Sequence, residues 1–89
     1  MLEKNISIVT IHKGEIKNLR KTLNSIDNQK VKNFKNYVIS PFVPKAELKK
    51  FKRTYRVFIL GKDKSLYNAM NIGLKHTWSD HVMFLNSGD

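Results

Sequence analysis

Apolar positions along the chain follow two periods that alternate from one end to the other. Four short runs are almost continuous in apolar residues, which is typical of strands covered on both faces: 6–11, 36–40, 56–60 and 81–85. Between them, apolar residues recur every three or four positions, which predicts amphipathic helices at 16–26, 44–53 and 66–76. The alternation predicts an α/β fold, a mostly parallel four-stranded sheet with helices on both faces.

The polar segments after the strands are where ligand chemistry is first expected. Parallel strands end at one edge of a sheet, and ligands bind at that edge where the strand order reverses. Three of the segments combine glycine with charged or amide side chains: 12–15, 61–64 and 86–89. The last, "NSGD", directly follows an apolar run, so it is expected to form one wall of a cleft.

The composition describes a single domain, residues 1–89, with a large excess of positive charge. Seventeen Lys and Arg against seven Asp and Glu give a net charge of +10. Most of the bases lie in 12–35 and 45–64, so the basic surface is assigned to the first two helices. Such a surface attracts nucleic acid, anionic lipid or phosphorylated ligands, or it is a solvated lysine-rich face without a dedicated partner.

Several classes of protein are disfavoured by what the sequence lacks. Without cysteine there is no disulfide and no thiolate metal site, which fits a reducing compartment. The opening "MLEKNISIVT" is unlike a signal peptide, and no apolar run approaches the roughly 20 residues that cross a bilayer. A glycine-rich phosphate loop is also missing, which argues against an ATPase or an NAD enzyme. We expect a cytoplasmic protein, with a peripheral position at the inner face of the membrane as an option.

The segment "KDKSLYNAMNIGLK" (62–75) is the most unusual in the chain. Asp63 comes just before the predicted helix, where the positive end of the helix dipole favours a carboxylate. Asn68 and Asn71 are three residues apart and therefore share one helix face. They are interpreted either as buried or ligand-facing amides, or as a polar stripe against solvent.

Asp89 and the histidines are the remaining candidates for metal binding. Magnesium and manganese prefer oxygen ligands, often one or two carboxylates, so Asp89 after "NSG" is a candidate ligand. The competing interpretation is ordinary turn chemistry. His12, His76 and His81 lack the spacing of a metal site and are expected to be structural.

Three segments together resemble inverting family 2 glycosyltransferases. "ISIVTIHKGEIKNLRKTLNSIDNQ" resembles their first strand and helix, and "KDKSLYNAMNIGLK" resembles their Asp-x-Gly-Ile-Tyr-Asp-Ala-Met-Asn-x-Gly segment. "VMFLNSGD" resembles the strand that ends in their DXD-type metal motif. The three occur in the family's order and span nearly the whole chain, and the second and third are the more specific.

The resemblance implies a Rossmann-like GT-A fold and the donor-binding N-terminal portion of an enzyme that builds surface polysaccharide. Its ligand would be a UDP- or GDP-sugar, and its cofactor a divalent metal, Mg or Mn, held by Asp89. It implies that the nucleotide-sugar site contains Thr10, His12, Asp63, Asn68, Asn71 and Ser87. The acceptor site and the catalytic base lie in a further half of the family's fold, so no catalytic residue is assigned and the truncated domain is expected to be inactive alone.

Two departures from the family pattern keep other functions open. The Asp-rich turn after the second strand is replaced by "SPFVPKAE", and Asn68 stands where the family has Asp. The alternatives are a non-enzymatic truncated α/β module and a basic nucleic-acid-binding domain, although no recognised nucleic-acid motif is present. If half of a fold is missing, the exposed apolar surface favours a homo-oligomer, a dimer or larger.

Overall fold

The computed structural model describes residues 6–30, 33–61 and 81–87, and the structural statements below refer to these ranges. In chain order the described elements are β1 (Ile6–His12), α1 (Ile16–Asp27), β2 (Phe34–Ser40), α2 (Lys45–Lys50), β3 (Arg56–Leu60) and β4 (His81–Ser87). In the described ranges no helix is both long enough and apolar enough to span a membrane.

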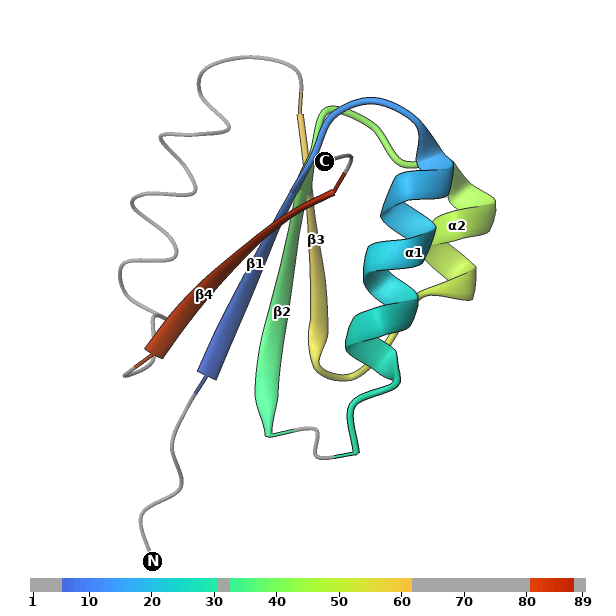
Figure 1. Cartoon of the computed structure of the whole chain (residues 1–89). Helices are drawn as coiled ribbons and strands as arrows, with labels where there is room; N and C mark the ends of the chain where they lie inside the picture. Colours follow the sequence, from blue (N-terminus) through green and yellow to red (C-terminus); the bar gives the residue numbers. More distant parts are fainter. Residues whose placement is uncertain (1–5, 31–32, 62–80, 88–89) are drawn as a thin grey trace, which may run out of the picture.

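The four strands form one sheet in the order β3-β2-β1-β4, and every neighbouring pair is parallel (Figure 1). This confirms the predicted four-stranded parallel sheet and the α/β class. The chain moves outward from β1 through β2 to β3, and β4 then adds on the other side of β1. The strand order therefore reverses between β1 and β4.

The two described helices, α1 and α2, lie on the same face of the sheet (Figure 1). The apolar stripe of α1, formed by Leu19, Leu23 and Ile26, packs into one buried cluster with sheet residues such as Ile8 and Val38. Burying this stripe is the main favourable term for an amphipathic helix, because helices of this length are marginal alone.

The opposite face of the sheet carries a second buried cluster, formed by Val9, Tyr37 and Ile39. Neighbouring residues of a strand point to opposite faces, so two clusters explain why the strands read as continuous apolar runs. The predicted helix at 66–76 lies outside the described residues.

Strand and helix ends differ from the predicted ones. Asn86 and Ser87, expected in a loop, are the last residues of β4, where they pair with Ile11 and His12. His12, also expected in a loop, is the last residue of β1. Their polar character predicted a turn, but hydrogen bonding to a neighbouring strand extends both strands.

The second helix is shorter than predicted, because it ends at Lys50 and not at Arg53. Phe51 closes it with φ −103° and ψ 13°, and its ring is buried in the cluster beneath α1. Pro44 precedes the first helical residue, consistent with a proline that opens a helix.

Candidate functional site

His12 and Ser87 meet at the carboxyl ends of β1 and β4, where the strand order reverses. They are register partners, and His12 Nδ1 lies 2.5 Å from Ser87 Oγ. Both residues are almost fully buried. Two residues 75 positions apart are thus joined by a hydrogen bond at the edge where ligands of parallel sheets bind.

Burial lowers the pKa of His12 below its ordinary value of 6.5, and a hydrogen bond with the backbone of Gly14 opposes this effect. The imidazole is therefore neutral at pH 7, with one ring nitrogen as a donor and the other as an acceptor. Ser87 can bond to Nδ1 in either tautomer. In the described ranges no carboxylate contacts His12.

Gly14 shapes the turn that leaves this site. Its φ of +110° lies in a region that glycine adopts easily and other residues rarely do. A Cβ added at this position would meet nothing within 4 Å, so only the backbone angle favours glycine here. The turn connects His12 to the N-terminus of α1 at Ile16.

Thr10, two residues before His12, belongs to a network of buried polar side chains. Its hydroxyl accepts a hydrogen bond of 3.2 Å from Asn36 Nδ2, which also donates to the Ile8 carbonyl at 3.0 Å. Arg56 Nε in turn donates to Asn36 Oδ1 at 2.7 Å. Thr10 is fully buried, and its hydroxyl is already hydrogen-bonded to a residue of the neighbouring strand.

Arg56 connects this network of buried polar groups to the end of α1. Its side chain is completely buried and donates to Asp27 at 2.7 and 3.2 Å and to the Phe51 carbonyl at 2.8 Å. The Tyr55 hydroxyl also donates to Asp27. Burial alone would raise the pKa of Asp27, but the bonds from Arg56 and Tyr55 and the charges of Arg56 and Arg53 outweigh it and hold the pKa low.

The sequence analysis did not identify this network. The signal for it was Asn36, since Asn is depleted in strands and this one lies in an otherwise apolar run. An amide at such a position needs partners when buried. Which residues become its partners depends on the strand order, and this cannot be read from the amino-acid sequence.

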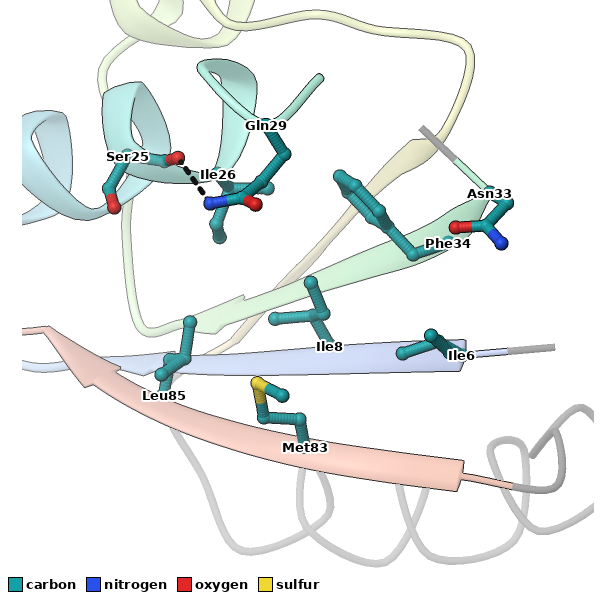
Figure 2. Close-up of a pocket in the computed structure, with 9 residues that line it drawn as sticks. All are labelled: Ile6, Ile8, Ser25, Ile26, Gln29, Asn33, Phe34, Met83 and Leu85. Carbon is teal, nitrogen blue, oxygen red and sulfur yellow. Dashed lines mark hydrogen bonds between the residues drawn. The ribbon is translucent and has the colours of Figure 1, made fainter. Parts of the chain in front are cut away.

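An apolar groove of about 370 Å³ lies away from the His12–Ser87 pair, between the end of α1 and the strands β1 and β4 (Figure 2). Its lining residues are Ile6, Ile8, Ser25, Ile26, Gln29, Asn33, Phe34, Met83 and Leu85. In Figure 2 the side chains of Ile8 and Met83 approach one another across its floor. The lining residues that the structure describes are apolar or neutral polar, and none of them is charged.

The structure places three of the predicted site residues and leaves four outside the described ranges. Thr10, His12 and Ser87 lie on one face of the sheet near its carboxyl edge, and the last two are in contact. Asp63, Asn68, Asn71 and Asp89 lie outside the described residues.

The described residues do not by themselves form a site for magnesium or manganese. In the ranges 6–30, 33–61 and 81–87 no group of three or more His, Cys, Asp or Glu side chains comes together. His12 and Ser87 supply one nitrogen and one hydroxyl, whereas these ions prefer carboxylate and other oxygen ligands. The predicted metal ligand, Asp89, is not among the described residues.

Comparison of this chain with protein-family models, with curated proteins and with solved structures found no match.

Proposed function

We propose that this chain binds a nucleotide-diphospho-sugar, UDP- or GDP-linked, as the donor-binding part of an inverting family 2 glycosyltransferase for surface polysaccharide. The proposal rests on one observation above the others. The carboxyl ends of β1 and β4 lie side by side where the strand order reverses, and His12 and Ser87 are hydrogen-bonded across them. The resemblance of three sequence segments to this family supports the same assignment.

Each described residue has a distinct part in the proposed site. The Ser87 hydroxyl at the end of β4 would contact ribose or phosphate oxygens, and the buried, neutral His12 imidazole would hold that hydroxyl in place. Thr10, bonded to Asn36, supports the strand that carries His12. Gly14 lets the chain turn sharply next to the bound ligand.

The proposal also includes residues outside the described ranges. Asp63, Asn68 and Asn71 would complete the nucleotide pocket, and Asp89 would hold the divalent metal. When bound, such an ion offsets the charge that develops on the leaving diphosphate. The absence of cysteine is consistent with the proposed cytoplasmic location, where nucleotide sugars serve as donors.

Amide NMR of the labelled protein tests this proposal. UDP-glucose and GDP-mannose are titrated to millimolar concentration with Mg²⁺, and the amides of His12, Gly14 and Ser87 are expected to shift and saturate. Because the chain is strongly basic, inorganic pyrophosphate is titrated as a control for simple attraction of anions.

Two matched variants sharpen the result. Ser87→Ala is expected to weaken binding by about fivefold to tenfold, the worth of one hydrogen bond. Ser25→Ala, a substitution on the exposed side of α1, should leave the affinity for the nucleotide sugar unchanged. Shifts that pyrophosphate reproduces in full, or no shifts with either nucleotide sugar, would refute the proposed donor site.

A further inference from the structure

Phe42 is the most exposed large apolar side chain in the described residues, at 65%. It lies in the β2–α2 loop, within "SPFVPK", between Pro41 and Pro44. The backbone amide of Phe42 donates to Ser40 Oγ at 3.3 Å, and that hydroxyl donates to the Phe42 carbonyl at 3.0 Å. The next residue, Val43, is buried in the core. The hydrogen bonds to Ser40 on one side and the burial of Val43 on the other therefore fix the loop, while the ring of Phe42 is exposed to solvent.

Three exposed lysines lie on the elements next to this loop. Lys45 is the first residue of α2, and Lys49 follows one turn later on the same exposed side of that helix. Lys13 lies in the β1–α1 loop, which runs next to the β2–α2 loop at the same end of the molecule (Figure 1). We call Phe42, Lys13, Lys45 and Lys49 the docking surface.

The acidic groups of the described ranges do not neutralise these lysines. Glu15, Asp27 and Glu47 each form an ion pair with another base, namely Lys17, Arg20, Arg53 or Arg56. Every arginine of the described ranges is occupied in this way. Within 6–30, 33–61 and 81–87 the positive charge without an ion-pair partner is therefore carried by lysine.

We propose that the docking surface binds an anionic lipid membrane, with Phe42 inserted among the headgroups and the lysines facing lipid phosphates. A protruding aromatic side chain within a lysine-rich surface is the chemistry of interfacial anchoring. Nucleic acid fits less well, because its recognition favours arginine, which binds phosphate in a bidentate manner, and stacked aromatic platforms. In this orientation the carboxyl edge of the sheet, with His12 and Ser87, faces the lipid surface.

Sedimentation with vesicles tests the proposal, and it needs no nucleotide, so its outcome is independent of the donor site. The protein is expected to bind vesicles of phosphatidylcholine mixed with phosphatidylglycerol and not vesicles of phosphatidylcholine alone. Phe42→Ala is expected to weaken this binding by about tenfold, as the transfer of an aromatic ring implies. Phe84→Ala removes a ring of β4 that is 56% exposed, and it should have no such effect.

A second pair of variants separates the docking surface from general charge. Lys45→Gln with Lys49→Gln should weaken binding by about tenfold or more, because each lysine near an anionic surface contributes independently. Lys30→Gln with Lys35→Gln removes the same charge at the opposite end of the sheet and is expected to weaken it far less. Equal losses from the two pairs, an unchanged affinity of Phe42→Ala, or binding to duplex DNA in preference to the vesicles would overturn the proposal.

Discussion

At the scale of single residues, His12 and Ser87 show how strand pairing creates a site from distant positions. Each is an ordinary polar residue at the end of an apolar run, and the two meet because β1 and β4 pair in register. Burial then gives His12 a lowered pKa, which an exposed histidine would not have.

The lowered pKa of His12 predicts an effect of pH on stability. The unfolded chain binds a proton near pH 6.5, whereas the folded chain binds it only at a lower pH. The contribution of His12 to stability is therefore present above pH 6.5 and is lost as the pH falls through its folded pKa. Urea unfolding of the wild type at pH 7.5 and at about pH 5 should show lower stability at the acidic pH.

His12→Gln is the control for this effect, because glutamine keeps hydrogen-bonding capacity without titrating. The variant is expected to show a smaller difference in stability between the two pH values than the wild type. An identical pH dependence in wild type and variant would show that other groups cause it.

At the scale of elements, the network from Asp27 through Arg56 to Asn36 joins the end of α1 to β3 and β2. Its ion pair is buried, so its partners are costly to leave unpaired. Arg53 also pairs with Asp27, at 3.4 Å, but its side chain remains 40% exposed. The same carboxylate thus has one buried and one solvated partner.

This difference predicts unequal effects of two arginine substitutions. Arg56→Ala removes the buried cation from Asp27 and the donor to Asn36 Oδ1, and it is expected to cost about 3–5 kcal/mol in free energy of unfolding. Arg53→Ala removes a solvated ion pair and is expected to cost less than about 1 kcal/mol. Urea denaturation of both variants measures the two values, and similar losses would contradict the assigned role of Arg56.

The charge of Asp27 gives the network its own acid sensitivity. Because the folded pKa of Asp27 is lowered, its contribution is complete above its ordinary value of 3.8 and is lost as the pH falls through the folded pKa. This loss begins at lower pH than the one expected from His12, because the ordinary pKa of Asp27 is 3.8 and that of His12 is 6.5. The two groups therefore affect different parts of the stability profile.

At the scale of the whole molecule, β4 is the outer strand of the described sheet on the side of β1. Met83, Phe84 and Leu85 are exposed, and 82–87 contains neither charge nor proline. Strand edges usually carry such groups, which block pairing with other chains. An outer strand with apolar side chains on both faces favours association.

Self-association through β4 is therefore the expected behaviour in solution. Light scattering should show a dimer or larger at high protein concentration, as apolar strand edges favour. Phe84→Lys with Leu85→Lys should shift the protein to monomer, whereas Phe42→Lys should not. A wild type that stays monomeric over the whole concentration range would contradict this prediction.

Much of the architecture could be predicted from the sequence alone. Continuous apolar runs with helical periods between them predicted the parallel four-stranded sheet and the two amphipathic helices α1 and α2. These features depend on local periodicity, which a single chain displays. The predicted ends of the strands were less accurate, because Asn86 and Ser87 pair with β1 and so extend β4.

The tertiary structure alone determined which distant polar groups meet. The strand order places His12 against Ser87 and Arg56 against Asn36 and Asp27, and none of these contacts follows from spacing along the chain. It also placed α1 and α2 on one face of the sheet. The reason is physical: periodicity records which face of an element is buried, whereas hydrogen-bond partners and pKa shifts depend on which elements lie next to each other.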